Sequence, residues 1–265
     1  MLHRISLAMT LLLLCGSLAG AADTPPRLRV LTYNIRHALG EDNVVDLSRI
    51  AEVIKQAKPD LVALQEVDVG VKRTNKVDQA RELGQMTGLQ SAFGKALNTG
   101  GGAFGNAILS RWPVQNVTVH PLPRGAKTES RIALSVRVRP RNGLPKLLFA
   151  TTLLGPESEE ERTLQLQEIN RKLVPTRHVD SILAGDFAAE PADSPIGVLL
   201  EKWEDTGGAE AEPTAPAKNP VRTVDYVMVS QPSGWKVVEV EVIDEQLASD
   251  HRPLLVVLEW HGEPK

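Results

Sequence analysis

The chain has 265 residues, of which 42% are hydrophobic and 24% are charged, a composition typical of a globular protein. Its 30 lysine and arginine residues are outnumbered by 33 aspartate and glutamate residues, and the formal net charge is −3. Because a surface that coats nucleic acid carries an excess of basic residues, this balance disfavours general nucleic-acid binding. It does not exclude a small or localised phosphate-bearing substrate.

The N-terminal segment is typical of an export signal. Arg4 precedes the apolar run ISLAMTLLLLCGSLAG, and the small residues of AGAAD provide a cleavage site near Ala21 or Ala22. A membrane anchor is the alternative, but the apolar run is short for one and no second span follows. Lipid attachment at Cys15 is disfavoured by the bulky Leu14 before it. We predict an exported protein, periplasmic or secreted, whose mature chain has no thiol and no transmembrane span.

From Arg27 onward, strand patterns and helix patterns alternate. RLRVLTYNI predicts a buried strand, and DLSRIAEVIKQAKPD predicts a helix with its apolar residues on one face. Asp46 is the expected N-cap of this helix, and Pro59 lies just beyond its end. LVALQEV predicts a second buried strand, and VDQARELGQMTG predicts a helix that ends at Gly88.

A run of short strands begins at Ser91. Turns separate five strand-like segments, SAFGKAL, GNAILSRWPV, NVTVHPL, RIALSVRVRP and KLLFATTLL, which indicates antiparallel pairing. EEERTLQLQEINRKLV predicts a long helix that leads to the strand DSILAGDF. A helix in PIGVLLEKW and a polar loop to about Val221 precede the last three strands, TVDYVMVS, WKVVEVEVI and PLLVVLEW.

This pattern predicts two packed sheets flanked by helices. After the predicted signal peptide over residues 1–22, no linker is rich enough in Pro, Gly or Ser to divide the chain. We therefore expect a single domain over residues 27–261. The longest flexible segment, GGAEAEPTAPAKNP, is interpreted as an insertion beside a site.

Polar residues stand where several apolar strands end. They are Asn34 in TYNIR, Glu66 in LQEVD, Asp186 in LAGDF and Asp225 in TVDYV, and SDHRP adds Asp250 and His251 before the last strand. Ligands collect at strand ends in α/β sheets, and converging oxygen atoms suit a hard cation such as Mg²⁺. Taken singly, an Asn or Asp at a strand end is often a turn residue. Glu66 is harder to explain in that way, because burying an unpaired carboxylate is costly.

Seven short motifs follow one another between Leu31 and Leu255: TYNIR, LQEVD, GNAILSR, ESRIALSVRV, LAGDF, VDYVMVS and SDHRPLL. In this order they resemble the endonuclease/exonuclease/phosphatase superfamily, which are metal-dependent phosphohydrolases with a deoxyribonuclease-like fold. The resemblance implies an α/β (α+β) fold class: a four-layer αββα sandwich in which two mixed β-sheets pack face to face with helices outside. The strand pattern leads to a similar layout.

The resemblance also implies roles for the matching residues. Glu66 is expected to be the principal ligand of Mg²⁺ or Mn²⁺, with Asn34 and Asp250 on the ion or on its waters. Asp186 is expected to orient or deprotonate the attacking water.

The remaining roles concern the phosphate. The resemblance implies that His251 faces the scissile phosphate and that Asp225, behind it, fixes its tautomer and supports its charge. Asn106 and Arg73 are expected to contact the substrate or to brace the site. Arg222, in PVRTVD, is a further candidate phosphate contact, with a solvated arginine as the alternative.

The chain departs from the family pattern in two motifs. Ala188 stands where GDFN has its Asn, and TTLLGP replaces THLD, so that Leu153 takes the histidine position and Gly155 the acidic one. Losing one preorganised donor to the transition state costs roughly 10²–10³ in rate. The alternative is that Leu153 and Ala188 simply pack against their neighbours.

We therefore predict a metal-dependent phosphohydrolase that cleaves a phosphodiester or phosphomonoester by in-line attack of water, weakened by Leu153 and Ala188. The expected cofactor is Mg²⁺ or Mn²⁺, the expected partner is a small or localised phosphate-bearing substrate, and the protein is expected to be a monomer. The alternative is a catalytically degenerate member that binds a metal and a phosphorylated ligand without turnover.

Overall fold

The computed structural model describes residues 24–141, 143–174, 179–207 and 212–262. The predicted signal peptide, with Cys15 and the cleavage region at Ala21 and Ala22, lies outside these residues. Within the described ranges, no helix is both long enough and apolar enough to cross a membrane.

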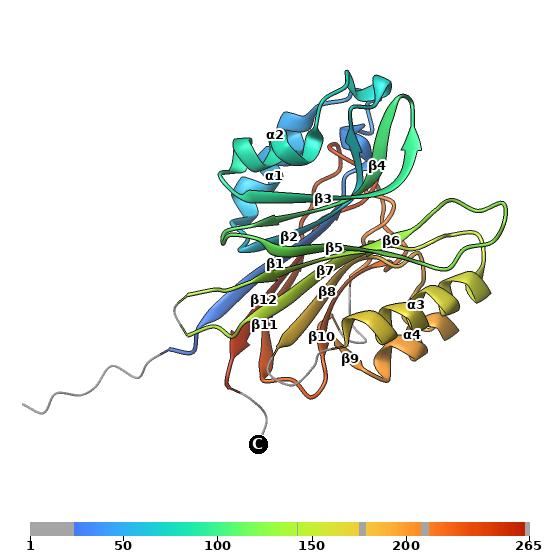
Figure 1. The fold of residues 1–265 in the computed structure, drawn as a ribbon. Coiled ribbons are helices and arrows are strands. Elements are labelled where there is room, and N and C mark those ends of the chain that lie inside the picture. Colours follow the sequence, from blue (N-terminus) through green and yellow to red (C-terminus); the bar gives the residue numbers. More distant parts are fainter. Residues whose placement is uncertain (1–23, 142, 175–178, 208–211, 263–265) are drawn as a thin grey trace, which may run out of the picture.

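Two six-stranded mixed sheets lie face to face (Figure 1). The strand order is β11-β12-β1-β2-β4-β3 in the first sheet and β5-β6-β7-β8-β10-β9 in the second. In the first sheet β1 and β2 are parallel, and in the second sheet β7 and β8 are parallel. The strands are β1 (Arg27–Asn34), β2 (Leu61–Val69), β3 (Gln90–Thr99), β4 (Gly102–Ser110), β5 (Gln115–Pro121), β6 (Ile132–Val138), β7 (Leu147–Leu153), β8 (Asp180–Asp186), β9 (Trp203–Asp205), β10 (Asp225–Ser230), β11 (Trp235–Val242) and β12 (Leu254–Trp260).

Helices cover the outer face of each sheet (Figure 1). They are α1 (Leu47–Ala57), α2 (Gln79–Thr87), α3 (Glu159–Leu173) and α4 (Ser194–Leu200). Asp46 caps α1 by accepting a hydrogen bond from the Ser48 N–H, and Gly88 ends α2 with a left-handed φ of 73°. Both helix boundaries were predicted from the sequence and are confirmed.

Apolar side chains form three layers of core. The central layer lies between the sheets and includes Leu28 and Phe149. On the outer face of the first sheet, Ile54 of α1 is buried with residues of β1, β2 and β4. On the outer face of the second sheet, Leu166 of α3 is buried with residues of β6, β7 and β8. These layers confirm the predicted αββα sandwich.

One predicted helix is too long. The pattern PIGVLLEKW predicts a helix through Trp203, whereas α4 ends at Leu200 and Trp203 begins β9. The Trp203 side chain is fully buried, its Nε1 donates to Asn170 Oδ1 at 2.9 Å, and its backbone pairs with Ser230. Burial and pairing with β10 therefore override the local helical pattern.

The strand pairing determines where the polar strand ends meet. In the second sheet, Leu153 is the register partner of Asp186, and Asp186 is the partner of Asp225. Residues of β1 in the first sheet lie close to residues of β8 and β10 in the second. Strand ends from both sheets therefore converge on one region of the sandwich.

Candidate active site

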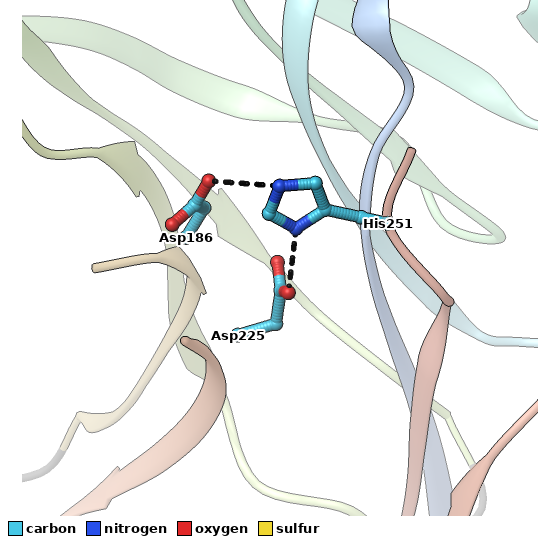
Figure 2. A group of neighbouring side chains, drawn as sticks. All are labelled: Asp186, Asp225 and His251. Atoms are coloured by element: carbon cyan, nitrogen blue, oxygen red, sulfur yellow. Dashed lines mark hydrogen bonds and ion pairs between the residues drawn. The ribbon is translucent and has the colours of Figure 1, made fainter. Parts of the chain in front are cut away.

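His251 lies between two buried carboxylates (Figure 2). Its Nδ1 is 2.9 Å from Asp225 Oδ2, and its Nε2 is 3.8 Å from Asp186 Oδ2. The other oxygen of Asp225, Oδ1, is buried and has no hydrogen-bond partner among the described residues. The ligand atoms of the three residues lie within 4.8 Å of one another. Because Asp225 engages Nδ1, the ring presents Nε2 to Asp186 and to the space beside it.

The protonation states of this group follow from its burial and its charges. Burial raises the pKa of the Asp186 carboxyl to about 6, and the negative charge of Asp225 adds to the effect. For His251, burial disfavours the charged ring, but the carboxylates of Asp225, Asp186 and Asp250 outweigh it and raise the pKa to about 10. At neutral pH the imidazole is therefore protonated while Asp186 is largely ionised. One group can accept a proton and the other can donate a hydrogen bond.

Asn34 links the two sheets at this point. Its Nδ2 donates to Asp186 Oδ2 at 3.0 Å and to Glu66 Oε1 at 3.2 Å, and its Oδ1 accepts from the Arg36 N–H at 3.1 Å. The side chain is almost fully buried, at 1% exposure. The amide nitrogen of Asn34 therefore bridges the carboxylates of Glu66 and Asp186.

Glu66 sits in a bulge of β2. The register with β4 shifts between Leu64 and Val67, and Glu66 itself has a left-handed φ of 59°. Burial raises the pKa of the Glu66 carboxyl, which the hydrogen bond from Asn34 only partly offsets. A half-buried carboxylate is an oxygen donor of the kind that Mg²⁺ and Mn²⁺ prefer, so Glu66 fits a divalent cation, while Asn34 turns its Nδ2 toward that carboxylate and orients it.

Asp250 is paired with Arg36. Its carboxylate is 40% exposed, and Oδ2 lies 3.5 Å from Nε of Arg36. Its negative charge nevertheless reaches the site, because it helps to raise the pKa of Glu66 and of His251.

A cavity of about 180 Å³ lies against these side chains. Asn34, Glu66, Asp186 and His251 line one side of it. Apolar groups and two arginines line the rest: Leu153, Leu154, Pro156, Ala188, Val224, Arg131 and Arg222. The predicted phosphate contact Arg222 is exposed at the rim. The cavity therefore combines carboxylates, a protonated histidine and two arginines with apolar groups.

The two departures from the family pattern both line the cavity. Leu153 ends β7, is 7% exposed and contributes an apolar side chain next to Asp186. Ala188 has a left-handed φ of 49°, and its N–H donates to Asp186 Oδ1 at 2.9 Å. The backbone at Ala188 thus orients the carboxylate, while its methyl side chain offers the cavity no donor.

Gly155 stands where the resemblance implies an acidic residue. Its N–H donates to Gln165 Oε1 at 3.1 Å. A Cβ at this position would lie 2.8 Å from Glu157 Oε2 and 3.3 Å from Glu161 Oε1. A side chain at position 155 would therefore displace the end of the Glu157 side chain, and an acidic one would add a third carboxylate beside Glu157 and Glu161.

Arg131 was not singled out from the sequence, although it lies within the motif ESRIALSVRV. The residue is only 8% exposed and lines the cavity. One terminal nitrogen lies 3.3 Å from Glu129 Oε2, and its Nε is buried without a hydrogen-bond partner among the described residues. Its position directly before the apolar strand β6 is the signal that could have identified it.

Arg73 and Asn106 lie outside the cavity lining. Arg73 makes a bidentate ion pair with Asp68, at 2.8 and 2.9 Å, and its guanidinium lies over the Phe104 ring. Asn106 is buried and donates to the Ile132 carbonyl oxygen at 3.2 Å. Of the two expected roles, substrate contact or bracing, these contacts fit bracing.

Known proteins share this fold. Residues 31–251 match the Endonuclease/Exonuclease/phosphatase family. A solved endonuclease/exonuclease/phosphatase from Beutenbergia cavernae is 27% identical, with a TM-score of 0.75 over 90% of this chain and 72% of that one.

Two further solved structures show the same fold at lower identity. The mannosyl-6-phosphatase of Bacteroides thetaiotaomicron is 16% identical, with a TM-score of 0.72 over 88% of this chain and 100% of that one. The human Nocturnin catalytic domain with a bound sulfate anion is 21% identical, with a TM-score of 0.69 over 89% of this chain and 94% of that one. Among curated protein sequences, none matches the chain. The match over residues 31–251, together with the fold, shows that the chain belongs to the endonuclease/exonuclease/phosphatase family.

Proposed function

We propose that the protein is a divalent-cation-dependent phosphohydrolase whose cavity takes a phosphomonoester or phosphodiester. The observation that carries the proposal is the group in Figure 2: a histidine kept protonated by Asp225 faces, across 3.8 Å, a carboxylate with a pKa of about 6. A base with a pKa near neutrality and a fixed cationic donor are the two groups that water attack on a phosphoryl centre needs.

Each residue has a part in the proposed reaction. Asp186, oriented by Asn34 and by the Ala188 N–H, accepts the proton of the attacking water. His251 donates a hydrogen bond from Nε2 to a phosphoryl oxygen, and Asp225 holds the ring in place. Arg131 and Arg222 line the same cavity and offset the charge of the phosphoryl group.

Glu66 is the residue that would hold the cation, with Asn34 orienting the Glu66 carboxylate and Asp250 acting on the waters of the ion. When bound, the cation supplies positive charge to the oxygens on which charge develops. Mg²⁺ and Mn²⁺ both suit this oxygen-rich set.

An assay on two generic substrates tests the proposal. The purified protein with Mn²⁺ or Mg²⁺ should hydrolyse p-nitrophenyl phosphate or bis-p-nitrophenyl phosphate, and Glu66→Ala should remove that turnover. Glu241→Ala, an exposed carboxylate on β11, is the matched control and should behave as wild type. Turnover that persists in Glu66→Ala, or that ignores chelation of the cation, contradicts the proposal.

The histidine pair gives a second test. Asp225→Asn should lower turnover nearly as much as His251→Ala, because without the carboxylate the pKa of His251 falls and the ring loses the partner that fixes its tautomer and orientation. Equal turnover in wild type and Asp225→Asn would show that the two residues are not coupled.

A ligand-binding protein without turnover is the second candidate function. Leu153 and Ala188 favour it, because the side chains at these two cavity positions donate no hydrogen bond. Calorimetry with inorganic phosphate and a phosphomonoester separates the two functions. A pure binder forms a stable complex in the presence of Mn²⁺ and releases no product over hours.

Export and a monomeric state belong to the same proposal and rest on the sequence alone. Residues 1–22 lie outside the described part of the chain. A processed N-terminus near Ala22 in a periplasmic or secreted fraction would support export, and an intact N-terminus retained in the cell would contradict it. Size-exclusion chromatography with light scattering tests the monomer.

A further inference from the structure

His37 is a histidine close to Glu66 for which the proposed reaction has no role. Its side chain is 13% exposed, and its Nδ1 lies 4.0 Å from Glu66 Oε2. That nitrogen is buried and has no hydrogen-bond partner among the described residues. A separation of 4.0 Å is too long for a hydrogen bond, so the ring faces the carboxylate without bonding to it.

The backbone that presents His37 is strained. Arg36, His37 and Ala38 have φ values of 44°, 46° and 62°, so three consecutive residues that are not glycine lie in the left-handed region. Such a run is unfavourable for L-residues and persists only where the surroundings impose it. The turn directly follows Asn34 and directs the imidazole back toward β2.

Specific contacts hold this turn in place. The Ala38 N–H donates to the Ile35 carbonyl oxygen at 2.7 Å. The buried side chain of Gln79 donates to the His37 carbonyl oxygen at 2.8 Å and accepts from the Asp68 N–H at 2.9 Å. Gln79 therefore ties the turn to β2, the strand that carries Glu66.

The arginine of the turn is also anchored. Its Nη1 lies 3.2 Å from Glu41 Oε1, and its Nε lies 3.5 Å from Asp250 Oδ2. Arg36 thus pairs with those two carboxylates, whereas Glu66 Oε2 has the His37 imidazole 4.0 Å away. The Glu66 backbone is left-handed as well, so two unfavourable conformations bring Glu66 and His37 face to face.

The geometry points to His37 as a nitrogen ligand of the same cation that Glu66 holds, and thus as the residue that makes the site prefer a first-row transition metal to Mg²⁺. Two atoms that each lie about 2.1 Å from one ion are at most about 4.2 Å apart, and the observed separation falls within that limit. Imidazole suits Zn²⁺, Fe²⁺, Ni²⁺ and Cu²⁺, whereas Mg²⁺ prefers oxygen ligands and retains several waters. This inference rests on the proposed cation site at Glu66.

Electron paramagnetic resonance with Mn²⁺ as the probe tests the inference without measuring turnover. Wild-type protein loaded with Mn²⁺ should show coupling to an imidazole nitrogen in its electron spin echo modulation, and His37→Gln should lose that coupling. His261→Gln, at an exposed histidine directly after β12, is the matched control and should keep it. Coupling that persists in folded His37→Gln overturns the inference.

Affinities provide an independent readout. His37→Gln should weaken Zn²⁺ binding by about ten-fold or more, and Mg²⁺ binding, measured by competition, by less than about three-fold. Equal losses for the two ions would overturn the assignment, because a merely structural role would not discriminate between them.

A further variant covers the case in which His37→Gln does not fold. His251→Gln should retain the nitrogen coupling, and loss of the coupling in that variant would assign the nitrogen to His251 and overturn the inference.

Glu66→Ala separates the two proposals. If it abolishes Mn²⁺ binding while His37→Gln keeps the coupling, the cation site stands and the role of His37 is wrong. If wild type binds no Mn²⁺, both are wrong.

Discussion

Asp186 is buried among Asn34, Asp225 and His251, where its carboxylate loses the hydration that favours ionisation. Burial and the charge of Asp225 raise its pKa to about 6, above the ordinary value of an aspartate. A carboxyl whose pKa is raised in the folded state favours folding most in its protonated form. This contribution is complete below the unfolded pKa, near 4, and is lost as the pH rises through about 6.

Asp186→Asn should therefore stabilise the protein at neutral pH while it removes turnover. The expected gain at pH 7.5 is on the order of 2–3 kcal/mol, because the variant never carries the desolvated charge. Urea unfolding at about pH 7.5 and pH 4 measures the effect, and the gain should shrink toward zero at the lower pH. An equal or lower stability at pH 7.5 would show that Asn34 and the Ala188 N–H fully satisfy the ionised carboxylate.

Leu153 and Ala188 decide how many donors the cavity has. The double variant Leu153→His with Ala188→Asn should raise hydrolysis of bis-p-nitrophenyl phosphate by about 10²-fold, and by more than either single change. Asn tolerates the left-handed φ of 49° at position 188 well, so Ala188→Asn should not strain the backbone. A folded double variant that turns over at the wild-type rate would indicate that substrate is held by other groups, such as Arg131.

At the scale of elements, the pairing of β7 with β8 sets the distance between Leu153 and Asp186. Gly185 precedes Asp186, and a Cβ at this glycine would lie 2.1 Å from the Thr152 carbonyl oxygen. The backbone of Thr152 cannot move aside as the end of a flexible side chain can. The two strands therefore approach this closely only because residue 185 has no side chain.

Gly185→Ala should lower the free energy of unfolding by about 3 kcal/mol or more and reduce turnover, because β8 and Asp186 must shift. Gly197→Ala is the matched control. Gly197 lies in α4, where an added methyl group would have no neighbouring atom within 4 Å, and the change should stabilise the protein by about 0.5–1 kcal/mol. Chemical denaturation of both variants measures the difference, and a stable Gly185→Ala variant would contradict the close strand packing.

At the scale of the whole molecule, the site joins the two sheets. Asn34 and Glu66 come from the first sheet, and Asp186 and Asp225 come from the second. A cation held by Glu66, whose carboxylate Asn34 orients, would bind only the folded arrangement and would therefore stabilise it against unfolding.

Mn²⁺ should accordingly raise the thermal unfolding midpoint. At a hundred-fold excess over its dissociation constant, the ion adds about 2.7 kcal/mol to the free energy of unfolding. Scanning calorimetry should show the shift in wild type and in Glu241→Ala, and no shift in Glu66→Ala. The same shift in all three proteins would place the ion elsewhere.

Local patterns in the sequence were sufficient to identify most elements and the order of the site motifs. Helix caps such as Asp46 and Gly88, the apolar face of α1 and the alternation of β-strands depend on neighbours along the chain, so they are readable without a fold. The same holds for polar residues at strand ends, which is why Asn34, Glu66, Asp186 and Asp225 were predicted as a group.

Only the tertiary structure decided where long side chains point and which of them share a cavity. Arg131 reaches the cavity while Arg73 pairs with Asp68, Asp250 faces Arg36, and His37 turns back toward Glu66. Trp203 joins β9 because its burial against the second sheet outweighs the local helical pattern. These outcomes depend on contacts between residues far apart in the chain, and the spacing of residue types along a sequence does not specify the rotamer, the backbone strain or the partner that such contacts select.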